Sequence, residues 1–132
     1  MSQVRVLQYS RAELEQNISK LDYPNGSSFI YNSKAELTED RKPIGRFVVN
    51  NTITRLGENL VLLNGNGTID TPIGVLEVLF TSRIITDVGI LGNNQLVKAT
   101  IVHKTGIYEN ASEVNIQALD DDAKTSIVSI VF

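Results

Sequence analysis

The chain has 132 residues, no cysteine, one histidine, and a net charge of −3 from 12 basic and 15 acidic residues. This length suits one domain that buries its own core, so we expect a single domain over 1–132. Without cysteine, disulfides and thiolate metal sites are excluded, and one histidine is too few for a usual zinc site. We therefore expect no metal and no cofactor. No basic run exceeds two residues, Arg41 and Lys42, which argues against a nucleic-acid partner.

The sequence shows no targeting or membrane segment. Residues 1–10 lack the apolar stretch and the small-residue cleavage site of a secretory signal. No apolar run approaches the ~20 residues of a membrane helix. We expect an intracellular, cytoplasmic protein with no membrane partner, although a mature chain from which a signal was removed also fits. The acidic run 120–122 predicts a solvated turn, because no closing glutamate of a calcium loop follows it.

The first 26 residues predict a short strand and a helix. Residues 3–9 favour the strand, and 11–21 favour the helix. Ser10 is a good N-cap, and Glu13 stands three residues later as in a capping box. The apolar stripe of this helix consists of Leu14, Ile18 and Leu21.

After Gly26 the hydrophobic period changes to that of strands, and 27–132 reads as the body of the domain. Seven further strands are expected, at 27–37, 44–54, 59–70, 74–80, 95–103, 113–119 and 125–132. No alternation of strands and helices appears, so a parallel sheet is not expected. The fold class is therefore all-β: an eight-stranded antiparallel β-barrel, or a barrel-like sandwich, with one short N-terminal helix.

The stretch from Asn64 to Gly74 holds three glycines but does not match a phosphate-binding loop. The spacing of the glycines differs from that of the known phosphate-binding motifs, and no lysine follows them. The next residues have the periodicity of a strand and not of a helix. Residues 71–74, "TPIG", predict a turn with Pro72 at its second position. Gly65 and Gly67 point to the same face of a strand, where paired glycines indicate a bend or the close approach of another group.

Three segments carry a resemblance to a known group of proteins. They are "SKAELTEDRKPIGRF", "NGNGTIDTPIGVLEVLF" and "HKTGIYENASEVNI". Their order resembles that of the allene oxide cyclase and dirigent β-barrel superfamily, whose late signature is "GGTGxYxxAxG". Thr105, Gly106, Tyr108 and Ala111 keep the signature's spacing, while His103 and Lys104 replace its first two glycines. The resemblance implies an eight-stranded antiparallel barrel with an apolar lumen, a trimer, and cyclase or isomerase chemistry that works by preorganising the substrate.

Two residues are candidates for acid–base chemistry. His103 follows Val97, Ala99 and Ile101 on a face taken as inward, which predicts an imidazole at the mouth of the lumen or a strand-end residue. Glu77 points outward if Leu76, Val78 and Phe80 face the core. With the opposite register it would be a lumen carboxylate with a raised pKa.

The candidates for ligand binding are the large side chains, and one amide, on faces taken as inward. They are Phe29, Tyr31, Phe47, Asn51 and Phe80. The same residues could fill a packed core, since an eight-stranded barrel either fills its interior or holds one small ligand. Tyr108 is expected to pack a loop.

Two functions remain open. The first is the binding of an apolar small molecule in the lumen, with cyclase or isomerase activity. The second is a non-catalytic structural or assembly subunit, for example of a homo-oligomer or a virus particle. Residues 127–132 are apolar on both faces of the last strand, so we expect a homo-oligomer, and the resemblance implies a trimer.

Overall fold

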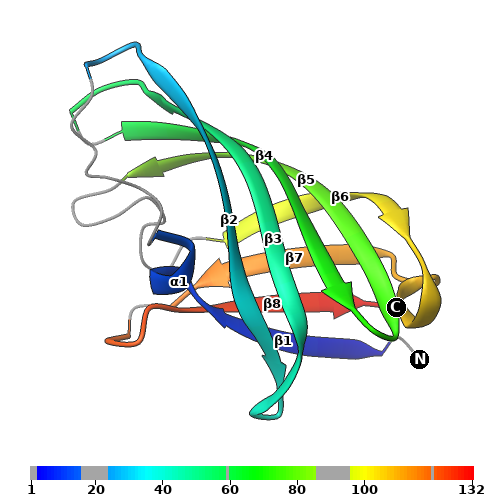
Figure 1. The fold of residues 1–132 in the computed structure, drawn as a ribbon. Helices are drawn as coiled ribbons and strands as arrows, with labels where there is room; N and C mark the ends of the chain where they lie inside the picture. The colour runs from blue at the N-terminus through cyan, green and yellow to red at the C-terminus, as the bar shows by residue number, and fades with distance from the viewer. Residues whose placement is uncertain (1–2, 16–23, 59, 86–95, 120) are drawn as a thin grey trace.

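The computed structural model is a closed antiparallel barrel in which every strand pairs with its neighbour in the sequence and β8 pairs with β1 (Figure 1). It describes residues 3–15, 24–58, 60–85, 96–119 and 121–132, without the side chains of 15, 29, 31 and 82–85. The elements are β1 (Val4–Ser10), α1 (Arg11–Glu15), β2 (Ser28–Glu39), β3 (Lys42–Arg55), β4 (Leu60–Thr71), β5 (Gly74–Ile85), β6 (Leu96–Lys104), the 3₁₀ turn η1 (Gly106–Tyr108), β7 (Glu113–Ala118) and β8 (Thr125–Val131). The predicted eight-stranded antiparallel barrel is confirmed.

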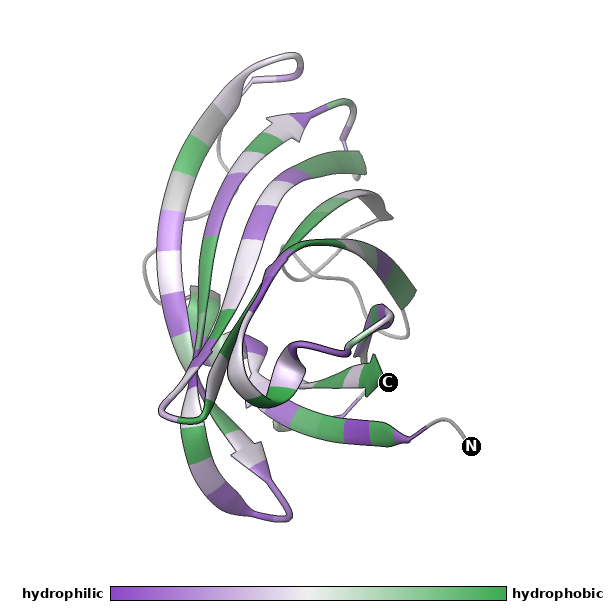
Figure 2. Cartoon of the chain, turned by 90° about the vertical axis from the view of Figure 1, so that its right-hand side faces the viewer, coloured by the Kyte–Doolittle hydropathy of each residue, from purple (hydrophilic) through white to green (hydrophobic). Residues whose placement is uncertain are grey.

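The strands form because apolar and polar residues alternate along them. In β3, Phe47, Val49, Asn51 and Ile53 are buried, while the residues between them lie on the outer surface. Figure 2 shows the same alternation as bands of green along the strands. In β8, Val128 and Ile130 face the interior, and Ile127 and Val131 are half-buried on the outside. The faces predicted for β2, β3 and β5 are confirmed at the described side chains.

Two tight turns join the long strands. Asp40 and Arg41 both have positive φ, 51° and 68°, as a two-residue hairpin turn of the favoured twist requires. At the second turn, Thr71 pairs with Gly74, and Pro72 and Ile73 form the loop. The Thr71 hydroxyl donates a hydrogen bond of 2.8 Å to the Gly74 carbonyl oxygen. The predicted turn at 71–74 is therefore confirmed.

The barrel is built from strands of unequal length. β2 to β5 have 12 to 14 residues, whereas β1, β7 and β8 have six or seven. The two tight turns, η1, the start of β1 and the end of β8 lie at one end, here called the hairpin end (Figure 1). The opposite end, with α1 and the β7–β8 connection, is the helix end. At the seam between β1 and β2 only Gln8 and Thr38 are in register.

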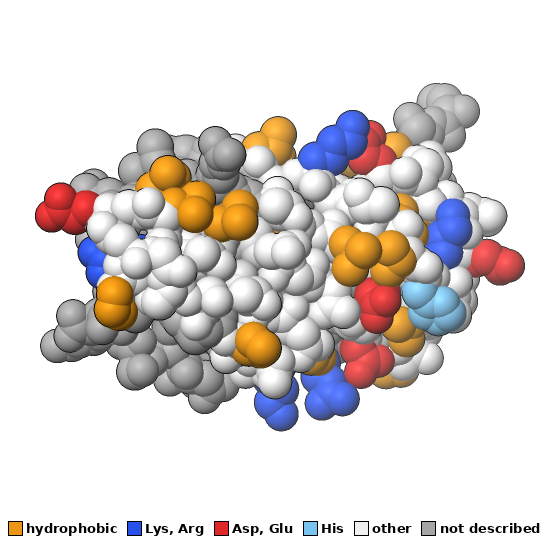
Figure 3. Space-filling view, turned by 90° about the horizontal axis from the view of Figure 1, so that it is seen from above, with side chains coloured by type: hydrophobic (Ala, Val, Ile, Leu, Met, Phe, Trp, Pro, Cys, Tyr) orange, Lys and Arg blue, Asp and Glu red, His pale blue; other side chains and the backbone are white. Residues whose placement is uncertain are grey.

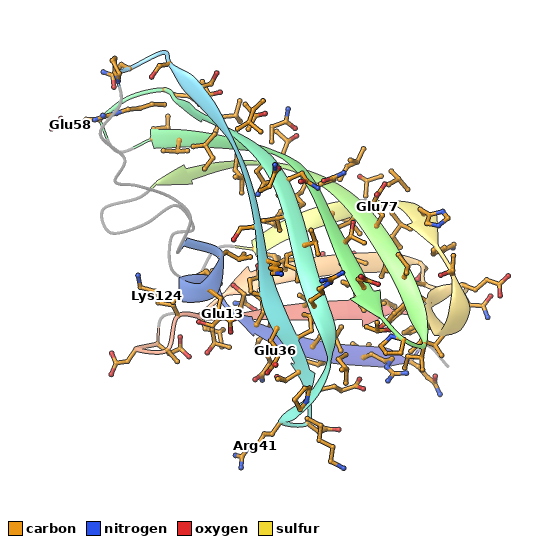
Figure 4. All side chains as sticks on the ribbon, in the orientation of Figure 1. Glu13, Glu36, Arg41, Glu58, Glu77 and Lys124 are labelled. Atoms are coloured by element: carbon orange, nitrogen blue, oxygen red, sulfur yellow. The ribbon has the colours of Figure 1, made fainter. Side chains whose placement is uncertain are left out.

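The N-terminal helix begins at Arg11, as expected, but its cap differs from the prediction. In the described residues it covers only Arg11–Glu15, and 16–21 lie outside them. The Ser10 hydroxyl donates to the Ala123 carbonyl oxygen at 3.3 Å. The Glu13 carboxylate accepts a hydrogen bond of 3.0 Å from the backbone N–H of Glu36 in β2, whereas a capping box requires it to accept one from the N–H of Ser10 (Figure 4). The capping-box prediction was wrong because Ser10 is still paired with Thr125 in the sheet.

Arg11 anchors α1 to the helix end. Its side chain is fully buried, and its guanidinium donates hydrogen bonds to the carbonyl oxygens of Thr125 and Leu119 and to the Ser126 hydroxyl. These bonds join the start of the chain to the turn before β8. In that turn the Asp121 carboxylate accepts the Thr125 N–H at 2.7 Å, which agrees with the turn predicted for 120–122 at its described residues. No helix in the described ranges is long and apolar enough to cross a bilayer.

Candidate functional site

The predicted ligand-binding residues of β3 and β5 meet at the centre of the barrel. Phe47, Asn51 and Phe80 are buried on the inner face. Cross-strand pairing places Tyr31, Asn51, Gly65 and Phe80 in one row across β2 to β5. The backbones of Phe29 and Tyr31 follow the inward alternation of β2, but their side chains lie outside the described residues.

The centre of the barrel is closely packed around the two glycines of β4. A Cβ atom at Gly67 would fall 2.5 Å from Phe47 Cζ and 3.3 Å from a Phe80 ring carbon. A Cβ atom at Gly65 would collide with the Asn51 side-chain oxygen. The Phe47 ring also packs on Tyr9, with centroids 4.9 Å apart and ring planes inclined by 35°. The glycines thus leave room for larger side chains from β3, which is one of the alternatives that their spacing left open.

The two acid–base candidates lie on the outside of the barrel. Glu77 is opposite His103 in the register of β5 and β6, and Figure 4 shows Glu77 on the outer side of the sheet. The inward position expected for His103 was wrong. Val78 pairs with Ile101 and Glu77 with His103, so a bulge at Val102 reverses the alternation before the histidine is reached. His103 is exposed, and neither residue faces the lumen.

A polar cluster lies inside the hairpin end, and the sequence reasoning missed it. Arg5 and Glu39 form a bidentate ion pair across the seam between β1 and β2, with Nη2–Oε1 at 2.6 Å and Nε–Oε2 at 3.0 Å. The Glu39 carboxylate raises the pKa of Arg5 above its ordinary value through this hydrogen bond. The pair reinforces a seam with one residue pair in register.

Tyr108 completes this cluster and closes the hairpin end. Its side chain is 0% exposed and lies against Gly74, where a Cβ atom would fall 2.9 Å from Tyr108 Cδ2. Burial raises the pKa of Tyr108, and the nearby Thr71 hydroxyl and the Arg5 guanidinium act in the opposite direction. The phenol is therefore held neutral beside a cation. Tyr108 thus packs η1 against the β4–β5 turn, in agreement with the loop-packing role expected for it.

One sequence signal pointed to part of this cluster. In β1, Arg5 is two residues from Leu7 and four from Tyr9, both of which are buried. The same period places the Arg5 side chain on the inner face. The same period places Glu39 on the face of the buried Ala35 and Leu37, because the extra residue at the register shift between β2 and β3 lies on β3. That Glu39 meets Arg5 could not be read from the period, since it depends on the pairing of β1 with β2.

The described residues hold no group of three or more histidine, aspartate or glutamate side chains that could bind a metal ion. A search of protein-family models and a search of curated proteins each found no match for the chain.

Proposed function

We propose that this chain is a non-catalytic structural or assembly subunit whose barrel serves as a packed scaffold. The observation that carries the proposal is the centre of the barrel, where Phe47 lies against Tyr9 and over Gly67. Interiors packed in this way add stability and leave no room for a ligand at that level. The two acid–base candidates, Glu77 and His103, lie outside the barrel and so do not favour lumen chemistry.

Assembly would use the outer face of β1 and β8. Val4 and Val6 are 55% and 44% exposed on this face. Val131 is opposite Val4, and Ile127 lies on the same outer face of β8. Exposed apolar side chains gathered on the outside of a barrel favour a protein–protein contact, although Ser129 and Gln8 lie between them on this face. A second copy of the chain is the partner that we propose, in a closed homo-oligomer. The resemblance described above suggests a trimer, and a virus particle is one setting for such a subunit.

Sedimentation equilibrium of the purified protein tests the assembly. We expect the wild-type protein to form a closed oligomer at high micromolar concentration. Val6→Lys should shift it toward the 14.5 kDa monomer. The matched control is Thr68→Lys, on the outer face of β4, which should leave the oligomer intact. A monomeric wild-type protein, or equal effects of the two lysines, would contradict the proposed contact.

A second candidate is a lumen enzyme of the allene oxide cyclase type. Tyr108, from the segment that resembles the superfamily signature, favours it, because its neutral hydroxyl lies inside the barrel near Thr71 and Arg5. Such a phenol could donate a hydrogen bond to an oxygen of an apolar substrate. Native mass spectrometry of protein purified from its source distinguishes the two functions. An apolar molecule retained in a one-to-one ratio would support the enzyme and contradict the scaffold.

A further inference from the structure

A groove crosses the outer face of the barrel over β3 to β6, away from β1 and β8. It has a volume of about 520 Å³. Gly65 lies in its lining, on one of the long strands that curve around this side of the barrel. This volume is in the range of small-molecule sites, about 300–1,000 Å³. The polar side chains that line it are Asn50, Asn64, Asn66, Thr81 and Thr100.

Strand register brings these amides and hydroxyls together in two neighbouring rows. Asn32, Asn50 and Asn66 are opposite one another on β2, β3 and β4, and the row continues through Leu79 to Thr100. In the next row, Thr52, Asn64 and Thr81 are opposite one another. Figure 3 looks onto this side of the barrel and shows a largely uncharged surface in the middle, with charged side chains toward the margins.

One atom of the groove lacks a partner among the described residues. The Oδ1 of Asn66 is buried and accepts no hydrogen bond there. By contrast, Oδ1 of the neighbouring Asn64 accepts a hydrogen bond of 2.9 Å from the Thr81 hydroxyl. A buried carbonyl oxygen without a donor is unfavourable, and the torsion of an asparagine amide is soft. Rotation of the Asn66 amide about this torsion would present the oxygen to a donor in the groove.

The chemistry of the lining selects the class of ligand. Each asparagine offers a donor and an acceptor, and each threonine hydroxyl can act as either. The one charged residue of the lining, Lys98, has its ammonium 3.5 Å from the Glu113 carboxylate, so an anion finds no uncompensated charge there. Leu79 is 46% exposed in the groove and offers an apolar surface.

We propose that this groove binds a neutral carbohydrate of one or a few sugar rings. The hydroxyls of a sugar pair with the amides of Asn50, Asn64 and Asn66, and one of them donates to Asn66 Oδ1. The C–H face of a ring packs on Leu79. Because the groove lies over β3 to β6, the proposal is independent of assembly through β1 and β8.

Nuclear magnetic resonance of the full-length ¹⁵N-labelled protein provides the test. The probes are neutral oligosaccharides of glucose, galactose, mannose and N-acetylglucosamine, at concentrations up to about 10 mM, ten times a Kd of about 1 mM. We expect at least one sugar to shift the side-chain amide signals of Asn50, Asn64 and Asn66 in a saturable way. Asn66→Ala and Asn50→Ala should each weaken binding about tenfold, which corresponds to about 1.4 kcal/mol. Asn110→Ala, in the exposed loop after η1, is the matched control and should bind as the wild-type protein does.

Three results would overturn the proposal. The first is that no sugar shifts these amides in a protein whose spectrum shows it to be folded. The second is that the Asn66→Ala protein, folded by the same criterion, binds as tightly as the Asn110→Ala control. The third is that inorganic phosphate, or dilution of the protein without sugar, shifts the three amides more than any sugar does. Phosphate would indicate an anion site, and a response to dilution would indicate a contact between copies of the chain.

Discussion

The ring of Phe47 occupies the space in which a side chain at Gly67 would lie, since a Cβ atom there would fall 2.5 Å from Phe47 Cζ. Gly67→Ala should therefore force the ring to move and lower the free energy of unfolding by about 1–3 kcal/mol. In Gly57→Ala, the control, the new Cβ atom would be 3.8 Å from Leu60 Cβ, and we expect a change within about 1 kcal/mol. Urea unfolding measures both. If the two variants lose the same free energy of unfolding, the Phe47 ring can move aside without loss of stability.

Phe47→Ala tests whether the centre of the barrel is packed. Phe47 is buried against Tyr9, so truncation leaves a cavity and should cost about 3–5 kcal/mol. Val48 is half-buried on the outer face, so Val48→Asp should cost only about 1 kcal/mol. Thermal or denaturant unfolding gives both values. A loss of only about 1–2 kcal/mol for Phe47→Ala would instead indicate an open lumen around the ring.

The ion pair between Arg5 and Glu39 should couple β1 to β2. Its side chains are 34% and 21% exposed, so solvent screens it in part, and we expect a coupling energy of about 1 kcal/mol in a double-mutant cycle. Arg46 and Asp70 form a comparable pair across β3 and β4, at 3.3 Å and with greater exposure. Its coupling should be smaller, below about 0.5 kcal/mol. A larger coupling for Arg46 and Asp70 would contradict a special role of the seam.

Tyr108 should make the protein sensitive to alkaline pH. Burial raises its pKa above the ordinary 10.0, so the folded protein keeps a proton that the unfolded chain releases. The stabilising contribution is fully present below pH 10.0 and is lost as the pH rises from there through the folded-state pKa. Tyr108→Phe cannot titrate, so its stability should fall less over the same range. Parallel pH dependences of wild-type and variant unfolding would contradict the prediction.

Local patterns determine most of this fold, and the sequence reveals them. Alternation from 27 onward predicted the long strands, because each buries one face. The turn at 71–74 followed from the chemistry of proline and glycine. For Gly65 and Gly67 the sequence left a bend and the close approach of another group open, and the structure shows the close approach. The capping box was predicted wrongly because Ser10, its N-cap, is also the last residue of β1. Pairing with Thr125 took precedence over the local capping pattern.

The sites depend on register between strands, which a single sequence does not specify. The row of Asn32, Asn50 and Asn66 exists only because three strands pair in that alignment. Because of the bulge at Val102, His103 lies on the outer face and not on the inner face that was expected. The residue types at that position do not predict a bulge. The cluster of Arg5, Glu39 and Tyr108 joins segments far apart in the chain. Only closure of the barrel brings these residues together.

The way in which β1 is held also determines when it can fold. Seven of its residues are in register with β8, and one is in register with β2. During synthesis Val4 leaves the ribosome long before Val131, so the first strand waits without its main partner while β2 to β7 pair in succession. Contacts between such distant residues form slowly, because a long loop must close first. We therefore expect closure of the ring to be the last event of folding, and a ribosome that stalls before β8 to leave β1 as an unpaired strand open to other chains.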